Sequence, residues 1–213
     1  MIIRHIMTTN VVTVPSDTSL IDARRIMEAH RIRRLPVVDR GKLVGLVNRD
    51  ALDRAGPSKL STFSIHEVSY LLSKLTVKEV MARDLVTISP DATWEQGVQL
   101  AQSRKVGALL VVEDDRLVGI VTTNDYFYRL INPVLGIGVP GARIHVHNCG
   151  GAAKVAEVLN VISGVGLDIE GMFIVPHPEE GSPELTIHLT SEDPSKAIDE
   201  LTRRGFLAHE RQR

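Results

Sequence analysis

The first two thirds of this 213-residue chain contain an internal repeat. Residues 7–48 match residues 81–122 at a constant offset of 74 positions and without a gap, so that Gly45 corresponds to Gly119. Self-similarity at a fixed offset is the signature of a fold built from copies of one unit. The chain is therefore expected to fold as two related units, followed by a C-terminal third of a different pattern.

Each copy predicts the same order of elements. A short strand, VVTV or LVTI, precedes a helix that begins after Ser19 or Thr93, because hydroxyl residues are favoured at helix N-caps. Two apolar runs follow, LPVVD with KLVGLV and LLVVE with RLVGIV, and the short polar turn inside each pair predicts a β-hairpin. A last helix begins near Asp50 or Asp125. The predicted unit is βαββα, and it occurs twice.

The C-terminal third predicts a second kind of domain. ARIHVHN alternates as a strand, GGAAKVAEVLNVISGVG has apolar residues at helical spacing, and two strands, a helix and a last strand follow. This βαββαβ order is a ferredoxin-like arrangement. The fold class is therefore α/β (α+β), with tandem repeats ahead of a ferredoxin-like domain.

Breaks in these patterns divide the chain into segments. Gly56-Pro57 ends the last helix of the first repeat, and the apolar spacing after it predicts a linker helix that spans the distance between the repeats or, alternatively, binds a partner. The string from Gly136 to Gly141 matches a dinucleotide fingerprint, but it follows a helix and leads into a strand, so we expect a hinge. The expected segments are repeat 1 (1–54), linker helix (55–75), repeat 2 (76–132), hinge (133–141) and C-terminal domain (142–213).

The doubled motifs resemble a known family. LPVVD, LVG(L/I)V and a terminal Asp, occurring twice in register, resemble a tandem pair of cystathionine-beta-synthase (CBS) domains over about residues 1–132. The C-terminal third is similar to an ACT domain, a small-molecule regulatory fold, over about residues 141–211, although CGG stands where that family has a Pro-Gly turn. The whole arrangement resembles the acetoin-utilisation protein B family, which implies a regulatory role and a homodimer.

Thr122 and Asp125 are the strongest candidates for a ligand site. They follow the apolar strand VGIV at the start of a helix, where a hydroxyl and a carboxylate are able to bond a ribose diol. Capping of that helix is the alternative, and the two roles can coexist. The CBS resemblance implies that these positions hold the ribose. The purine is then expected against Val86, Thr87 and the segment Gly107, Ala108 and Leu109.

The first repeat departs from this pattern. Asn48 stands in place of the Thr, and the spacing from Gly45 to Asp50 is one residue shorter than that from Gly119 to Asp125, so Asp50 is expected to point differently. Arg31, Arg33 and Arg34 either grip a polyphosphate or form a solvated basic edge. The residues expected to line this second site are Val12, Thr13, Arg33, Arg34, Leu35, Pro36, Asn48 and Asp50.

Histidines gather in the predicted C-terminal sheet. With Ile144 and Val146 facing the core, His145 and His147 point to the other face, His188 lies on a neighbouring strand, and His209 lies on the last strand. One hypothesis is a histidine cluster that binds a transition metal or senses pH, with His145, His147 and His188 as metal candidates. The alternative is a polar or interfacial face, because no carboxylate or cysteine completes a ligand set at a known spacing.

Composition narrows the function classes. The chain is 43% hydrophobic and 24% charged, as in globular proteins, and charges interrupt every apolar run, so neither a membrane span nor a secretion signal is expected. Cys149 is the only cysteine, which suits a reducing cytoplasm. Twenty-five basic residues against 26 acidic ones and 4% aromatics argue against nucleic acid as a partner.

We therefore expect a non-catalytic cytoplasmic regulator, since no nucleophile elbow, P-loop or HExxH motif is present. Its regulatory ligand is expected to be AMP, ADP or ATP, with no cofactor acting as a catalyst, a target protein of unknown identity and a homodimeric state. Acetoin or acetyl-CoA metabolism is the expected context. A ligand-independent scaffold and a metal-binding or amino-acid-sensing regulator that acts through the ACT-like domain are the alternatives.

Overall fold

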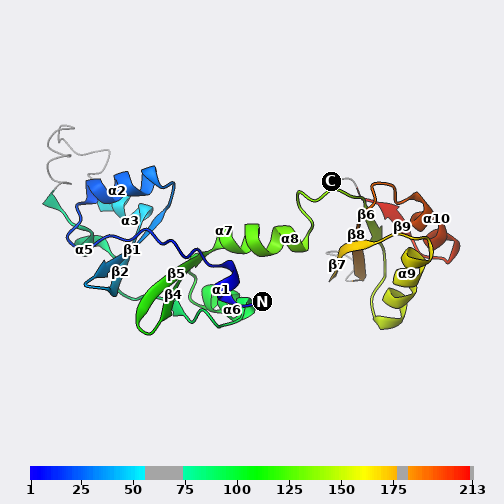
Figure 1. Ribbon diagram of the computed structural model, residues 1–213, viewed down its shortest axis with the longest axis horizontal. Helices are drawn as coiled ribbons and strands as arrows, with labels where there is room; N and C mark the ends of the chain where they lie inside the picture. The colour runs from blue at the N-terminus through cyan, green and yellow to red at the C-terminus, as the bar shows by residue number, and fades with distance from the viewer. Residues whose placement is uncertain (56–73, 177–181, 212–213) are drawn as a thin grey trace. The chain divides into compact units, whose positions relative to one another are not determined.

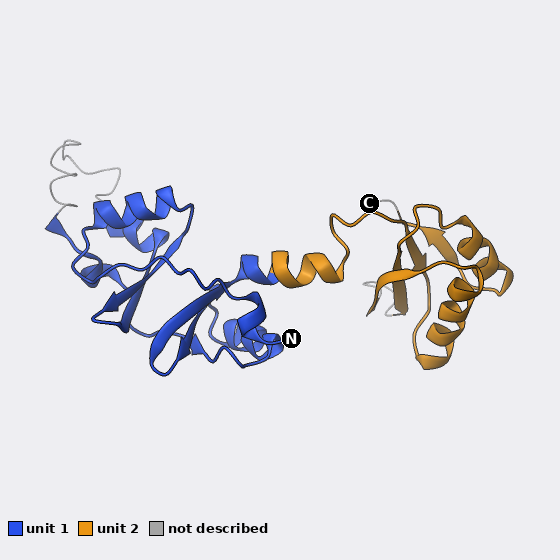
Figure 2. Cartoon of the chain, in the orientation of Figure 1, with its two compact units in different colours: residues 1–126 blue, residues 127–213 orange. Residues whose placement is uncertain are grey.

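The computed structural model describes residues 1–55, 74–176 and 182–211. The chain forms two compact units, residues 1–126 and 127–213 (Figure 2). Within the described ranges, no helix combines the length and the apolar character needed to cross a membrane. The predicted linker helix lies almost wholly outside the described residues.

The first unit contains the two predicted repeats (Figure 1). In each repeat a helix is followed by an antiparallel hairpin and a second helix, as the sequence predicts. The expected strand VVTV is reduced to one parallel bridge between Val14 and Val37, whereas its counterpart is a two-residue strand parallel to the hairpin. The elements are α1 (Ile3–Ile6), α2 (Leu20–Ala29), β1 (Arg34–Asp39), β2 (Lys42–Asn48), α3 (Arg49–Ala55), α5 (Val77–Val80), β3 (Thr87–Ile88), α6 (Trp94–Ser103), β4 (Ala108–Glu113), β5 (Arg116–Thr122) and α7 (Thr123–Tyr126).

The predicted helix starts in the two repeats are confirmed. The Ser19 hydroxyl accepts a hydrogen bond from the Asp22 backbone N–H at the start of α2. At the start of α6, Thr93 and Gln96 bond each other's backbone N–H groups in a complete capping box. Caps of this kind satisfy N–H groups that have no partner inside the helix. They fix where each repeat turns from the first strand segment into its helix.

The short helices that precede each repeat are exchanged between the repeats. Ile3 and Ile6 of α1 are fully buried in the core of repeat 2, and Val77 of α5 is fully buried in the core of repeat 1. Figure 1 shows α1 beside α6, β4 and β5, and α5 beside β1 and β2. Burial of an aliphatic side chain of this size stabilises by about 1.5–3 kcal/mol. Each repeat therefore needs the other copy's leading segment to complete its core.

Two repeated glycines make this exchange possible. A Cβ atom on Gly45 would lie 2.3 Å from the Met81 Sδ, and a Cβ atom on Gly119 would lie 2.6 Å from the Met7 Sδ. Both distances are far below van der Waals contact, so only glycine lets each methionine reach the hairpin of the other repeat. The repeated Met and Gly positions are thus partners across the two copies rather than within one copy.

The second unit has the predicted ferredoxin-like order. Its sheet order is β7-β8-β6-β9, with every neighbouring pair antiparallel, and α9 and α10 cover one face of it (Figure 1). The core joins both helices to Ile144, Val146, Leu185 and Ile187. The elements are a π-helical turn η1 (Phe127–Ile131), α8 (Asn132–Val134), β6 (Arg143–Val146), α9 (Ala152–Gly164), β7 (Ile169–Pro176), β8 (Pro183–Leu189), α10 (Ser195–Arg203) and β9 (Ala208–Glu210).

The glycine-rich segment ahead of β6 belongs to this second unit and packs against β8. The Pro140 carbonyl lies 3.1 Å from the His188 Nε2. Gly141 has a φ of +119°, and a Cβ there would lie 1.9 Å from the Leu189 carbonyl oxygen. The close approach and the positive φ both require glycine at this position. The segment leads into a strand rather than a helix, so it has no context for dinucleotide binding.

Candidate functional site

The Asp125 side chain lies at the junction of β5 and α7. Its Oδ2 accepts hydrogen bonds from the backbone N–H of Thr122 at 2.8 Å and from the Thr122 hydroxyl at 2.7 Å. Its Oδ1 accepts a third bond, from the Thr8 hydroxyl at 3.2 Å. The carboxylate therefore caps its own helix, which is the structural alternative considered for it, and it is half-buried at the wall of a pocket.

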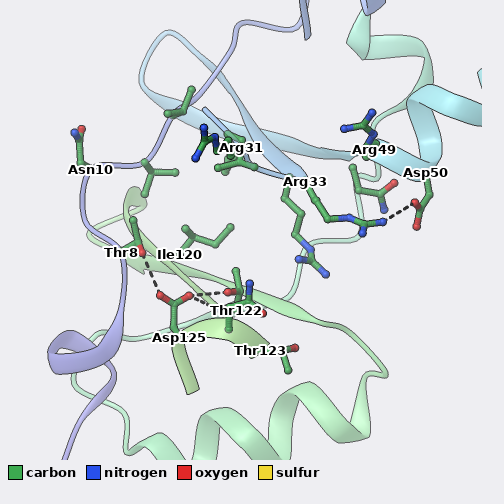
Figure 3. A pocket seen from close by; sticks show the side chains of 17 residues that line it. Thr8, Asn10, Arg31, Arg33, Arg49, Asp50, Ile120, Thr122, Thr123 and Asp125 are labelled. Carbon is green, nitrogen blue, oxygen red and sulfur yellow. Dashed lines mark hydrogen bonds and ion pairs between the residues drawn. The ribbon is translucent and has the colours of Figure 1, made fainter. Parts of the chain in front are cut away.

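This pocket, of about 560 Å³, lies between the two repeats. Figure 3 shows Asp125 and Thr122 on one side and Arg31, Arg33 and Asp50 on the other. Its size falls in the range usual for small-molecule sites. The lining residues are Thr8, Asn10, Val11, Val12, Arg31, Ile32, Arg33, Arg34, Pro36, Asn48, Arg49, Asp50, Ile120, Thr122, Thr123, Asn124 and Asp125.

The structure groups the predicted residues differently from the sequence expectation. Thr122 and Asp125 line the pocket together with first-repeat residues, namely Thr8, Asn10, Val11 and Val12, while Ala108 pairs with Thr122 in the hairpin. The expected purine contacts lie outside the pocket: Ala108 and Leu109 are buried, Val86 packs on the repeat 2 core, Thr87 is exposed in β3, and Gly107 touches Arg34. The exchange of the leading segments is the reason, because it carries Thr8 and the residues after it across to β5.

Most of the first-repeat candidates do line the pocket. Val12, Arg33, Arg34, Pro36, Asn48 and Asp50 are among its lining residues. Leu35 is fully buried in the core and Thr13 is exposed elsewhere, so neither reaches it. Asn48 accepts a bond from the Ala51 N–H at 2.8 Å and so caps α3, and Asp50 lies 3.4 Å from an Arg33 nitrogen.

Positive charge gathers on the repeat 1 side of the pocket. Arg31, Arg33, Arg34 and Arg49 all line it. The half-buried Arg34 guanidinium lies against Gly107, where a Cβ atom would come within 2.7 Å of its Nη2. Burial lowers the pKa of Arg34, the neighbouring Arg33 lowers it further, and Asp50 opposes both effects. A partly desolvated cation beside other cations favours an anionic ligand.

Sequence reasoning missed several lining residues. Thr8, Asn10 and Ile120 were not candidates, and neither were Arg49 and Asn124. Arg49 could have been found from the sequence, since it lies next to the candidate Asp50 at the start of a predicted helix. Thr8 carries none, because its contact with Asp125 depends on the exchange between repeats.

The predicted histidine cluster of the second unit forms in part. The rings of His145, His147 and His209 stack with centroids 5.0–5.5 Å apart. The ring of His188, the third candidate, has its Nε2 3.1 Å from the Pro140 carbonyl oxygen. The carboxylate of Glu184, which the sequence did not single out, bonds two of the rings instead. Across the described residues, no group of three or more His, Cys, Asp or Glu side chains is arranged to hold a metal ion.

Comparisons with known proteins agree with the repeat architecture. A family model described as "CBS domain" matches residues 3–57 and 77–132. The chain is 34% identical over 125 residues to inosine-5'-monophosphate dehydrogenase of Korarchaeum cryptofilum, which covers 58% of this chain and 23% of that enzyme. It is 30% identical over 124 residues to the CBS domain-containing protein YhcV of Bacillus subtilis, covering 58% of this chain and 81% of YhcV. The chain thus spans about a quarter of the dehydrogenase and most of YhcV.

Two solved structures are similar over the same share of the chain. A Vibrio cholerae protein assigned to acetoin utilization is 33% identical, with a TM-score of 0.53 and coverage of 62% of this chain and 91% of that chain. The CBS domain pair of protein MJ0100, solved in complex with 5'-methylthioadenosine and S-adenosyl-L-methionine, is 28% identical, with a TM-score of 0.51 and coverage of 62% and 96%.

Proposed function

Because this chain belongs to the CBS-domain family, we propose that its first unit is a regulatory module that binds an adenine nucleotide, AMP, ADP or ATP, and that the protein acts without catalysing a reaction. The ligand occupies the pocket between the repeats. The ribose hydroxyls bond Asp125 and Thr122, and the phosphates lie against the arginines of repeat 1.

One observation carries this proposal: a fixed carboxylate at a helix start faces a cluster of arginines across one pocket. A carboxylate oxygen accepts from sugar hydroxyls, whereas guanidinium groups donate in pairs to phosphate oxygens. The MJ0100 domain pair was solved with two adenosine derivatives, which supports adenosine as the common part of the ligand. The arginines favour a phosphorylated adenosine over a sulfonium such as S-adenosylmethionine, because like charges repel.

The proposal extends to the setting of the protein. The similarity to the Vibrio cholerae protein supports a role in acetoin or acetyl-CoA metabolism. The resemblance of both units to regulatory modules that pair with copies of themselves supports a homodimer. The ACT-like domain then passes the nucleotide signal to a target protein. A single cysteine, Cys149, fits a cytoplasmic location.

Isothermal titration calorimetry tests the proposal. Wild-type protein is titrated with AMP, ADP, ATP and S-adenosylmethionine, and at least one nucleotide is expected to bind more tightly than the sulfonium. Asp125→Ala is expected to weaken the binding of that nucleotide about tenfold or more, since it removes a charged hydrogen-bond acceptor. Asp84→Ala, which removes an exposed carboxylate outside the pocket, serves as the matched control. Absence of heat with all three nucleotides, or an unchanged affinity in Asp125→Ala, would overturn the proposal.

A further inference from the structure

The sheet face of the second unit that α9 and α10 leave uncovered carries a compact group of titratable side chains. His145 lies on β6 and His147 directly follows the strand, two residues further along the chain, where its ring stacks on that of His145. His209 on β9 is the register partner of His145. Ring centroids are 5.2 Å apart for His145 and His147, 5.5 Å for His145 and His209, and 5.0 Å for His147 and His209, with interplanar angles of 16°, 11° and 26°. We call these three rings the imidazole stack.

One buried carboxylate bridges two rings of the stack. Glu184 on β8 is only 7% exposed. Its Oε2 lies 2.9 Å from the His145 Nε2, and its Oε1 lies 3.0 Å from the His147 Nδ1. A buried carboxylate needs such donors, because an unpaired charge is costly to desolvate. The geometry fixes which nitrogen of each ring carries a proton toward Glu184.

The stack brings three imidazole rings together beside one bonded carboxylate. Stacked cations about 5 Å apart repel each other, and Glu184 supplies a single negative charge to offset them. The charged and titratable side chains on the described strands around the stack belong to β6 and the residue after it, to β8, to β9 and the residue after it, and to the bulge of β7 beside His188: Arg143, His145, His147, Glu184, His188, His209, Arg211 and Glu170. The segment from Asn132 to Gly141, which packs near His188, contains no titratable side chain. Among them, Glu184 is the carboxylate that contacts the rings of His145 and His147.

His209 responds most strongly to this environment. Burial lowers its pKa below the ordinary histidine value, and His147, His145 and Arg211 lower it further, whereas Glu184 raises it. A base whose pKa is lowered in the folded state binds fewer protons there than when released. Its contribution to stability is fully present above the ordinary pKa of about 6.5 and is lost as the pH falls below that value.

The strand that carries His209 is weakly held. β9 has three residues and lies at the edge of the sheet, where β6 is its one partner among the strands that the structure describes. Beside its ladder, the His147 N–H donates to the Leu207 carbonyl at 2.9 Å and the Arg211 N–H donates to the Arg143 carbonyl at 2.9 Å. Short edge strands with few hydrogen bonds open at low free-energy cost, separately from the rest of a domain.

We propose that the imidazole stack and Glu184 form a proton-operated latch that holds β9 on the sheet at neutral pH and releases it on acidification. Protonation of His209 places a cation against the rings of His147 and His145, and separation of β9 from β6 relieves the repulsion. Release exposes the backbone edge of β6, which is a surface able to pair with another strand. This latch does not depend on nucleotide binding by the first unit.

Amide hydrogen exchange of the full chain tests the latch. The probes are the His147 and Arg211 amides, and the reference is the Leu189 amide of β8, which donates to the Ala142 carbonyl. Protection is compared at pH 7.5 and 5.5 after correction for the intrinsic rate at each pH. In wild type, the two probes are expected to lose more than about threefold protection relative to the reference on acidification, because His209 binds protons more readily when β9 is released than when it is packed. An equal loss at probes and reference, or none at all, overturns the proposal.

Two variants and a control separate the latch from general acid sensitivity. His209→Gln removes the His209 imidazole. It is expected to reduce the loss of protection at the His147 and Arg211 amides to less than about threefold. Glu184→Gln removes the negative charge that contacts the stack and is expected to increase the loss of protection beyond that of wild type. His30→Gln changes an exposed histidine of the first unit and should behave like wild type. A His209→Gln protein as acid-sensitive as wild type, or a Glu184→Gln protein less sensitive than wild type, contradicts the mechanism.

Discussion

The Asp125 carboxylate shows how one residue serves both the fold and the site. It accepts two hydrogen bonds from Thr122 and one from Thr8, so the protein itself fixes its orientation. An acceptor that is already oriented loses little conformational freedom when a sugar hydroxyl approaches, which favours binding. Helix capping and ligand binding therefore reinforce each other at this position. The same bonds connect the last helix of repeat 2 to the leading segment of repeat 1.

Arg34 tests the phosphate side of the site. Arg34→Gln is expected to weaken ATP binding about tenfold while it changes adenosine binding less than about threefold, because only the phosphates use the guanidinium group. Calorimetry with ATP and with adenosine measures the two changes. Arg104→Gln, at an exposed arginine outside the pocket, is the control. An equal loss for ATP and adenosine would mean that Arg34 supports the fold of the pocket rather than the phosphates.

Gly45 tests the contact that joins the repeats. Gly45→Ala forces a Cβ atom against the Met81 side chain and is expected to lower the free energy of unfolding by about 1–3 kcal/mol, as overpacking does. Chemical denaturation measures the loss, and Gly164→Ala, where the Cβ meets open space, is the control. If the contact is the cause, Met81→Ala combined with Gly45→Ala destabilises by less than the sum of the two single changes.

At the scale of elements, the exchanged helices α1 and α5 are small but structurally decisive. Each is only four residues long, which is too short to be stable alone. Each is held by burial of apolar residues in the other repeat and by backbone bonds such as Thr8 N–H to Ile120 C=O and Ala82 N–H to Leu46 C=O, both 2.9 Å. Local helix propensity contributes little to them, and tertiary packing contributes most.

Ile6 tests this assignment. Ile6→Ala removes a side chain that is 1% exposed in the repeat 2 core and is expected to cost about 2–5 kcal/mol. Because α1 packs on repeat 2, amide protection should fall first in β4 and β5, although Ile6 belongs to repeat 1 in the sequence. Amide hydrogen exchange measures the protection of the β1–β2 hairpin and of the β4–β5 hairpin separately. A loss that begins in β1 and β2 would argue against the exchange.

At the scale of the whole first unit, the exchange makes the two repeats one folding unit. Neither repeat has a complete core without the leading helix of the other copy, so we expect them to unfold together. The pocket is lined by both repeats, and a ligand there is bound only while both are folded.

Ligand stabilisation tests this coupling. ATP at 100 times its dissociation constant is expected to stabilise the first unit by about 2.7 kcal/mol, since it binds only the native state. The amide protection of β2 and of β5 should rise by the same factor if the repeats unfold as one. Hydrogen exchange with and without ATP provides the measurement, and adenine-free triphosphate serves as the control. A rise confined to β5 would show that repeat 1 unfolds separately.

The amino-acid sequence by itself determined the elements and their order. The fixed offset predicts two equal units, the Ser19 and Thr93 caps predict where their helices begin, and strand alternation predicts which face of the C-terminal sheet carries His145 and His147. These properties depend on residues a few positions apart, which a linear pattern records directly.

Only the tertiary structure decided whether the repeated methionines contact the glycine of their own repeat or that of the other repeat. Met7 is equivalent to Met81 and Gly45 to Gly119, so the sequence is equally compatible with contacts within a repeat and contacts between repeats. The structure has the contacts between repeats, and these bring the Thr8 hydroxyl to the Asp125 carboxylate. Leu109, which was predicted to contact the purine, is buried in the core. Glu184 likewise joins the imidazole stack through strand register, which depends on backbone pairing between distant segments.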